Sequence, residues 1–281
     1  MLFALEHGKN HDDVRQWLAA TQADAVFEGT SLNVDSGEPA ISHIRAALEY
    51  GAHAITANKG PIVHAYRDLR DLAARRGRRF LFESTVMDGA PIFSMFRDSL
   101  PVVEVRGFCG ILNSTTNVIL SGIEQGMTFE ESLKKAQDLG IAETDPSYDV
   151  DGWDATVKVA ALVNVIMDTP LKPAQVVRNG IRRLTAEAVR TARASGRPYK
   201  LVCRARRTGR APSSVEASVE PEQVPAGNPM ALVAGTSSII RFETDIFPGL
   251  TITEENPGLQ ATAYGMLADF IRAASPNDSH L

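Results

Sequence analysis

Helical and strand-like stretches alternate along the first 85 residues, and this alternation constrains the fold more than any other feature of the chain. Helical periods fall at residues 14–20, 38–50 and 63–76, and strand-like runs fall at residues 23–33, 53–58 and 79–83. Alternation of this kind builds βαβ units, whose strands run parallel. We therefore predict an α/β protein that opens with a partial Rossmann-like sheet, in which the strand within residues 23–33 is buried.

The rest of the chain predicts a second α/β unit. A strand-like run at residues 100–112 precedes helices at residues 114–125, 128–139 and 152–167, and Thr128 with Glu131 has the spacing of a capping box. Further strands are predicted at residues 199–207, 237–243 and 250–253, and residues 208–230 are predicted to form a loop with one short strand. A final helix is predicted at residues 259–274.

The segment of residues 136–158 contains six acidic residues and one lysine, and it is predicted to form a loop and the helix that follows it. Asp154 and Lys158 are four apart, which puts them on one face of that helix, and Asp151 is predicted to precede them on the same face. Residues 159–167 are apolar, so we expect the helix to enter a core and desolvation to lower the pKa of Lys158, as proton transfer requires. The alternative is a surface ion pair without function.

The same segment resembles the signature of the homoserine dehydrogenase family. The matching positions are Ala136, Gly140, Asp145, Pro146, Asp149, Gly152, Asp154 and Lys158. The segments GILNSTTNVIL at 110–120, TANKGP at 56–61, FESTVMDGAPI at 82–92 and GEPAISHIRAALEYG at 37–51 resemble the family as well. The resemblance extends from about residue 24 to about residue 269 and is to a short form without a C-terminal regulatory extension of the ACT type.

The resemblance implies an oxidoreductase that reduces L-aspartate 4-semialdehyde to L-homoserine with NADPH or NADH, a step in threonine, methionine and isoleucine biosynthesis. It also implies three segments. Residues 1–90 would be the remaining part of a nucleotide-binding domain, residues 91–256 a substrate and dimerisation domain with an open sheet, and residues 257–281 a helix that packs back on the first domain. A homodimer is the implied assembly.

The resemblance assigns catalytic roles to three residues. Lys158 would transfer the proton to the forming alkoxide, with Asp154 as its partner on the helix, and Lys59 would lie near the nicotinamide and the reacting oxygen. The alternative for Lys59 is a lysine that caps the carboxyl end of a strand.

Three further residues would bind the amino-acid substrate. Glu143 and Asp149, together with Asp154, match the acidic positions around the substrate ammonium group, and Thr115 lies at a helix start that could hold the substrate carboxylate. The alternatives are a solvated loop acid for Glu143, a turn residue for Asp149 and an N-cap for Thr115.

The resemblance also implies residues that bind the cofactor and a cation. Thr30, Asn58 and Lys59 would line the nicotinamide ribose pocket, and Glu83 with Val86 matches positions that bind a monovalent cation such as Na⁺. The alternative for Glu83 and Val86 is a hinge without an ion.

The chain also departs from the family. No two of its 21 glycines are separated by a single residue, so it has no G-x-G-x-x-G phosphate-binding turn, and we expect the first βαβ unit to be absent and cofactor binding to be weak. Met87 and Asp88 replace hinge glycines, and Ile141 replaces a tyrosine. Two alternatives follow: a non-catalytic homologue that acts as a binding or oligomerisation partner, and a relative that reduces a different small aldehyde.

Composition limits the partners and the cellular compartment that we expect for this protein. A net charge of −5 and a pI near 5.7 argue against nucleic-acid binding, and no apolar run is long enough to span a membrane. The start of the chain is too acidic for a signal peptide. Cys109 and Cys203 are predicted to be buried free thiols, which favours a cytoplasmic protein.

Overall fold

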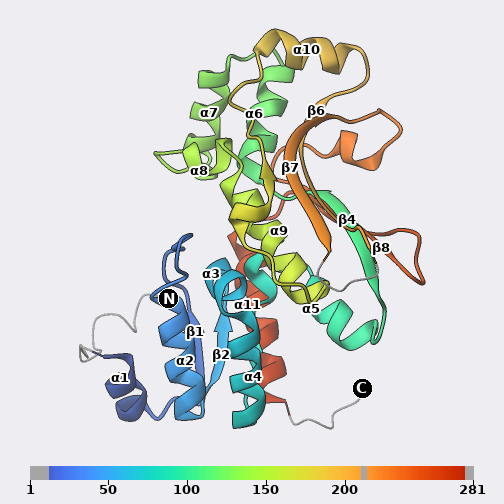
Figure 1. Ribbon diagram of the computed structural model, residues 1–281. Coiled ribbons are helices and arrows are strands. Elements are labelled where there is room, and N and C mark those ends of the chain that lie inside the picture. The colour runs from blue at the N-terminus through green and yellow to red at the C-terminus, as the bar shows by residue number, and fades with distance from the viewer. Residues whose placement is uncertain (1–12, 210–213, 276–281) are drawn as a thin grey trace.

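A three-stranded parallel sheet forms the first part of the protein. The computed structural model describes residues 13–209 and 214–275, so the segment used above to argue against a signal peptide lies almost wholly outside the described residues. The strands are β1 (Ala25–Glu28), β2 (His53–Thr56) and β3 (Phe80–Leu81), in that order. The helices are α1 (Val14–Thr21), α2 (Ala40–Tyr50), α3 (Lys59–His64) and α4 (Tyr66–Arg76) (Figure 1).

Local sequence explains where two helices of this part end. The structure also corrects two predictions. Helices α2 and α4 end at Gly51 and Gly77, whose φ angles of 104° and 61° suit glycine. The helix predicted at residues 63–76 is two helices, because the chain breaks at Ala65 with φ of −142°. The strand predicted to be buried lies at the edge of the described sheet, where Phe27 is 50% exposed.

A six-stranded sheet forms the second part. Its strands are β4 (Val105–Ile111), β5 (Val177–Arg178), β6 (Tyr199–Arg207), β7 (Val215–Gln223), β8 (Ser238–Thr244) and β9 (Leu250–Glu254), in the order β5-β7-β6-β4-β8-β9. All pairs are antiparallel except β5 with β7. The prediction of a short strand within residues 208–230 is wrong, since β7 has nine residues, and the run predicted from residue 100 becomes a strand only at Val105.

Helices cover this second sheet. They are α6 (Ser114–Glu124), α7 (Phe129–Asp138), α8 (Ser147–Val150), α9 (Trp153–Ile166) and α10 (Ala186–Ala194), of which α8 and α10 were not predicted. The capping box predicted for α7 is confirmed, since Thr128 and Glu131 exchange hydrogen bonds. Helix α9 is buried over most of its length and packs against β6 and β7.

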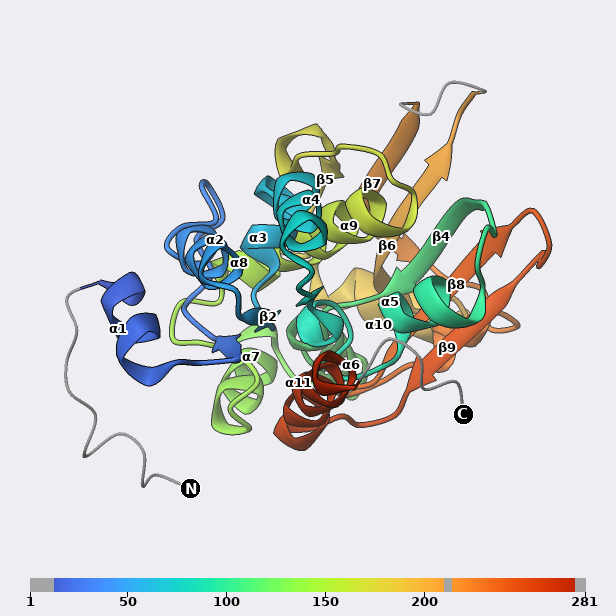
Figure 2. The same ribbon diagram turned by 90° about the horizontal axis from the view of Figure 1, so that it is seen from below.

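The last helix returns to the first sheet. Helix α11 (Leu259–Ala274) packs on β1, β2 and the 3₁₀ turn η1 (Glu83–Thr85), and the ring of Phe270 lies 5.6 Å from that of Phe27. Short segments α5 (Ile92–Ser94) and η2 (Met95–Ser99) connect the two sheets, and short turns η3 (Pro173–Gln175) and η4 (Pro229–Leu232) complete the second part. Figure 2 shows the large sheet on one side of the molecule and α1 on the opposite side. The α/β class is thus confirmed, and the division at residues 90 and 257 stays a prediction.

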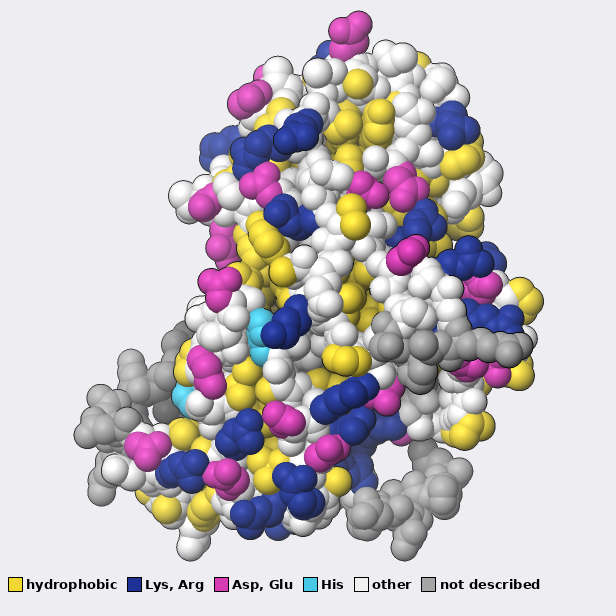
Figure 3. Space-filling model, in the orientation of Figure 1, with side chains coloured by type: hydrophobic (Ala, Val, Ile, Leu, Met, Phe, Trp, Pro, Cys, Tyr) yellow, Lys and Arg dark blue, Asp and Glu magenta, His cyan; other side chains and the backbone are white. Residues whose placement is uncertain are grey.

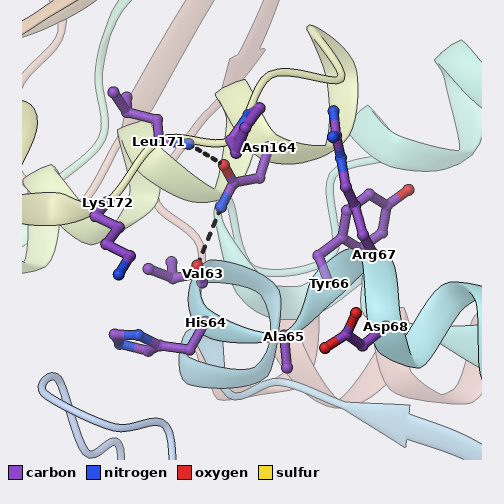
Figure 4. A pocket seen from close by; sticks show the side chains of 10 residues that line it. Val63, His64, Ala65, Tyr66, Arg67, Asp68, Asn164, Leu171 and Lys172 are labelled. Carbon is purple, nitrogen blue, oxygen red and sulfur yellow. Dashed lines mark hydrogen bonds between the residues drawn. The ribbon is translucent and has the colours of Figure 1, made fainter.

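Helices α3 and α9 join the two parts. The side-chain amide of Asn164, near the end of α9, donates to the carbonyl oxygens of Ile62 and Val63, both at 3.2 Å. Its carbonyl oxygen accepts from the backbone N–H of Leu171 at 2.7 Å (Figure 4). One buried amide therefore fixes the carboxyl end of α3 relative to α9.

Three further observations concern helix length, surface charge and the cysteines. Among the described residues, no helix combines the length and apolar character needed to cross a membrane. Acidic and basic side chains are mixed over the face seen in Figure 3. Both cysteines are free, and Cys203 is buried whereas Cys109 is only partly buried.

Candidate active site

The carboxylate of Asp154 lies where the two parts of the protein meet and contacts three side chains. Its Oδ2 is 3.2 Å from Nζ of Lys158 and accepts from Nδ2 of Asn113 at 3.0 Å, and its Oδ1 is 3.3 Å from Nζ of Lys59. Asp154 and both lysines have side chains less than a fifth exposed. The structure thus brings together the three residues that the sequence assigned to catalysis.

Each of these side chains comes from a helix that begins at the junction. Asp154 is in the first turn of α9, which follows Gly152 with φ of 83°, and Lys158 lies one turn further. Nζ of Lys158 also donates to the carbonyl oxygen of Leu112, directly after β4, at 2.6 Å. Lys59 opens α3, whose N-cap is Asn58. Lys59 therefore faces a carboxylate of the other part, which argues against the simple strand-capping alternative.

The charges of this cluster stabilise one another. Burial alone would raise the pKa of Asp154, but Lys158, Lys59 and the hydrogen bond from Asn113 hold it well below its usual range. Burial alone would lower the pKa of Lys158, but the carboxylates of Asp154, Asp88 and Asp149 together raise it. The prediction of a lowered lysine pKa is therefore wrong, because it considered desolvation without the buried carboxylate that offsets it.

Asp149 forms a second layer beside this cluster. Its Oδ1 accepts from Nδ2 of Asn113 at 2.7 Å, and its Oδ2 accepts from the hydroxyl of Thr115 at 2.8 Å. Burial and the nearby charge of Asp154 raise the pKa of Asp149. The Thr115 hydroxyl oxygen also lies 3.2 Å from the carbonyl oxygen of Ile141, which is the weaker alternative acceptor for its single proton. Asp149 is therefore more than a turn residue, since it fastens α8 to the start of α6.

Asn113 connects both carboxylates, and sequence reasoning did not single it out. It is the N-cap of α6, with Oδ1 accepting from the backbone N–H of Thr116 at 2.9 Å, so the N-cap alternative proposed for Thr115 is wrong. The amide nitrogen remains free to bridge Asp149 and Asp154. An asparagine directly before a helix start was the signal that could have identified it.

Two acidic residues of the predicted cluster point elsewhere. Glu143 is exposed, and its carboxylate makes no hydrogen bond or ion pair with the residues that the structure describes. Asp151 ends α8 instead of preceding Asp154 on α9, and it pairs with Arg182 at 2.8 Å. The expectation that Asp151 shares the face of Asp154 and Lys158 is therefore wrong, because Gly152 separates two helices.

The carboxyl ends of β1 and β2 carry the residues assigned to the cofactor. The carboxylate of Glu28, only 3% exposed, accepts from the hydroxyls of Thr30 and Thr56 and from the backbone N–H of Thr30. Nδ2 of Asn58 donates to the carbonyl oxygen of Thr30 at 3.0 Å. Glu28 was missed, although an acid inside an apolar strand is a signal for a buried hydrogen-bonded carboxylate.

This edge has room for a ligand. A Cβ built on Gly29 would meet no atom within 4 Å, and Gly29 and Thr30 are both exposed. Open α/β sheets bind ligands outside the carboxyl ends of their strands. The residues therefore fit the nicotinamide end of a dinucleotide, which would place it next to Lys59.

Glu83 has a structural role in the hinge. Its two carboxylate oxygens accept from the backbone N–H groups of Phe93 and Ser94 at 2.7 and 2.8 Å, and its own N–H donates to Asp269 on α11. Val86 follows in the same turn and is buried. These bonds agree with the hinge alternative, and a cation held by Glu83 and Val86 stays a prediction.

A separate cavity of about 170 Å³ lies beside the junction (Figure 4). Its walls include His64 and Arg67 from one part and Asn164, Leu171 and Lys172 from the other. None of the catalytic candidates lines it, so it belongs to the joint between α3 and α9 and not to the Asp154 cluster.

A parallel sheet with an open carboxyl edge, beside a buried lysine–carboxylate cluster, is the arrangement expected of an oxidoreductase of the dinucleotide-dependent class. Comparison with known proteins agrees: the family model described as homoserine dehydrogenase matches residues 91–271. The chain belongs to the homoserine dehydrogenase family, whose members are NAD(P)-dependent oxidoreductases.

Individual relatives support this assignment. The NAD(+)-dependent homoserine dehydrogenase of Pseudomonas canavaninivorans is 36% identical over 89% of this chain and 70% of its own length. The homoserine dehydrogenase of Methanocaldococcus jannaschii is also 36% identical, over 89% of this chain and 72% of its own.

Solved structures are similar as well. A protein from Archaeoglobus fulgidus described as a homoserine dehydrogenase has a TM-score of 0.85 at 30% identity, and the match covers 98% of this chain and 82% of that one. A hyperthermophilic archaeal homoserine dehydrogenase mutant in complex with NADPH has a TM-score of 0.80 at 26% identity, covering 99% and 80%.

Proposed function

We propose that this protein interconverts L-homoserine and L-aspartate 4-semialdehyde with NAD or NADP. The observation that carries the proposal is the Asp154 carboxylate, which holds Lys59 and Lys158 together in a largely buried position between the two parts. Family membership and relatives named homoserine dehydrogenase support the same reaction. The reaction belongs to amino-acid biosynthesis.

Lys158 is the proton-transfer group in this proposal. Its raised pKa keeps the ammonium form at neutral pH, and an ammonium can stabilise the alkoxide that forms during reduction and then donate a proton to it. Lys59 adds a second positive charge on the cofactor side of Asp154. The nicotinamide cofactor supplies or accepts the hydride when it is bound.

Other residues would hold the reactants in place. Asp149 and Thr115 form a hydrogen-bonded pair at the start of α6, next to the cluster, and would orient the polar groups of the substrate. Glu143, exposed on the neighbouring loop, would contact the substrate only from outside this layer. Thr30 and Asn58 would contact the ribose next to the nicotinamide through the open edge of β1 and β2.

The proposal also includes a bound cation, the domain organisation, the oligomeric state and the cellular compartment. Glu83 and the carbonyl oxygen of Val86 would hold a monovalent cation at the hinge. Residues 1–90 would serve as the nucleotide-binding domain, residues 91–256 as the substrate and dimerisation domain, and residues 257–281 as the helix that completes the first domain. We propose a cytoplasmic homodimer that takes a small-molecule substrate and binds no nucleic acid; free thiols and a net charge of −5 support this setting.

The test is oxidation of homoserine by the purified chain with NAD⁺ and with NADP⁺, measured alongside fluorescence titration of NADH and NADPH. Turnover that is lost in Lys158→Ala while cofactor binding is kept supports the proposal. Cofactor binding without turnover of homoserine would favour a different small aldehyde as substrate. Absence of both would favour the non-catalytic alternative.

A further inference from the structure

Glu254, the last residue of β9, lies in the same row of the large sheet as the end of β4. Ile111 of β4 is paired with Ile239 of β8, and Ser238 of β8 is paired with Glu254. Leu112 follows Ile111, the last residue of β4, so the same register continued by one residue places Leu112 opposite Ser238 and in one row with Glu254. Neighbouring strands are about 4.8 Å apart. The backbone of Glu254 is therefore roughly 10 Å from that of Leu112, whose carbonyl oxygen accepts from Lys158.

Glu254 also lies on the correct face of the sheet. Ile240 and Ile252 are paired, and both pack in the core cluster that contains the buried residues of α9. Side chains two apart on a strand share a face, so Glu254 points to the side that α9 covers. A glutamate side chain can extend from this row toward Lys158.

One oxygen of this carboxylate has no partner. Oε2 of Glu254 is buried and makes no hydrogen bond to any described residue. A buried carboxylate oxygen without a donor is costly to the folded protein, and in a native structure it calls for an explanation, of which a bound ligand or water is one. Burial and the charge of Asp88 raise the pKa of Glu254 to about 7, although Lys158 acts in the opposite direction.

The other buried carboxylates of the site are already satisfied. Asp154 has Lys59, Lys158 and Asn113 as donors, and Asp149 has Asn113 and Thr115. An amino-acid substrate brings an ammonium group that needs an acceptor away from water. Within residues 13–209 and 214–275, Glu254 is the acid near Lys158 whose carboxylate keeps a buried oxygen without a donor.

We infer that Glu254 binds the α-ammonium group of the amino-acid substrate and so selects amino-acid over deamino substrates. The inference rests on the proposed function and names a residue outside the motifs that led to it. Asp88 supports this role from the hinge, where its Oδ1 accepts from the hydroxyl of Thr262 on α11 at 2.8 Å. The substrate ammonium would then sit between Glu254 and Asp88, with the reacting oxygen toward Lys158.

The experiment compares homoserine with 4-hydroxybutyrate, which lacks the ammonium group, in the full chain and in Glu254→Gln. Loss of a charge-assisted hydrogen bond of about 1.5–3 kcal/mol corresponds to roughly 10–100-fold. We expect kcat/KM for homoserine to fall by that factor, mainly through KM, while kcat/KM for 4-hydroxybutyrate changes less than about threefold. Glu254→Asp should recover part of the loss because it keeps the charge.

Glu255→Gln is the matched control, because Glu255 is the exposed neighbour in the chain, and it should leave both substrates unaffected. An equal loss for both substrates in Glu254→Gln, or an unchanged KM for homoserine in an active protein, would overturn the inference and leave the proposed function standing. If the unmodified chain does not oxidise homoserine, the proposed function fails. Calorimetric titration of homoserine into both proteins then decides the inference, since equal or absent binding overturns it.

Discussion

Lys158 and Asp154 lie one helical turn apart on α9 and form an ion pair of 3.2 Å between side chains that are 17% and 14% exposed. Lys134 and Asp138 on α7 have the same spacing, but their side chains are 69% and 62% exposed. Identical spacing thus gives a surface pair in one helix and a buried pair at the junction in the other. The difference lies in what packs around each helix, and it is the buried pair that can stabilise a developing charge.

Replacing Lys158 by Met should remove proton transfer and keep the fold, because Asp154 retains Lys59 and Asn113 as partners. Proton transfer by a positioned side chain contributes about 10²–10⁴-fold, so kcat for homoserine oxidation should fall by that order. Titration of NADH should change little, because Lys158 faces Asp154 and Leu112 on the second part. Lys134→Met is the control, and a comparable loss of kcat there would show that the assay reports stability and not chemistry.

Asp154→Asn should destabilise the protein because it leaves two lysines without their carboxylate. Breaking a buried ion pair by removing one partner costs about 3–5 kcal/mol. The folded pKa of Asp154 is held below its unfolded value near 3.9, so its contribution is present above about pH 4 and is lost as the pH falls further. Urea unfolding at pH 7 and at pH 3 should therefore show a large difference between variant and parent at pH 7 and a smaller one at pH 3. Asp138→Asn should show neither effect.

The sequence predicted most of the elements, because their signals are local. The capping box at Thr128, the helix of residues 259–274 and the strand that begins at Tyr199 all depend on neighbouring residues or on periodicity along one segment. The break at Ala65 and the nine-residue length of β7 depend on tertiary packing and on pairing with β6. Neither the break at Ala65 nor the length of β7 can be predicted from the local sequence pattern.

The candidate site was predicted in its residue types and in the pairing of Asp154 with Lys158, but not in its long-range connections. Lys59 and Asp154 are 95 positions apart, so their contact depends on how α3 packs against α9. The pKa of Lys158 was predicted in the wrong direction because its sign depends on three carboxylates whose positions only the fold determines. Asn113 and Glu254 were missed because one is an N-cap and the other ends a strand, and neither position is by itself a sign of function.

Gly89 and Gly265 should not tolerate a side chain, because the hinge and α11 approach closely there. A Cβ on Gly89 would lie 2.3 Å from the carbonyl oxygen of Ala261, and one on Gly265 would lie 2.8 Å from the Cα of Gly89. Gly89→Ala should therefore cost about 1–3 kcal/mol of unfolding free energy and loosen α11. Hydrogen exchange along α11 measures the loosening. Gly227→Ala, where a Cβ would meet nothing within 4 Å, should have the stability of the parent.

The affinity for homoserine should depend on the ionisation of Glu254. Its pKa is about 7 because of burial and the charge of Asp88, with Lys158 opposing, and only the ionised form can hold an ammonium group. KM for homoserine should therefore rise as the pH falls below 7, and Glu254→Gln should remove this dependence. Ser238, the residue paired with Glu254 on β8, does not titrate in this range. A variant whose KM still follows the parent's pH profile would assign the dependence to another group.

Glu254→Gln should stabilise the folded protein at high pH, although it weakens the binding of homoserine. A carboxyl whose folded pKa is raised is favourable below its unfolded value, near 4.3, and loses that contribution as the pH rises toward 7. Glu254→Gln should therefore be more stable than the parent at pH 8 and close to it at pH 4. After allowance for solvent screening of this partly exposed side chain, the gain is on the order of 1 kcal/mol, or about 2–4 °C in Tm. A glutamate that only supported the fold would instead lower Tm when replaced, so thermal unfolding at the two pH values separates a binding residue from a structural one.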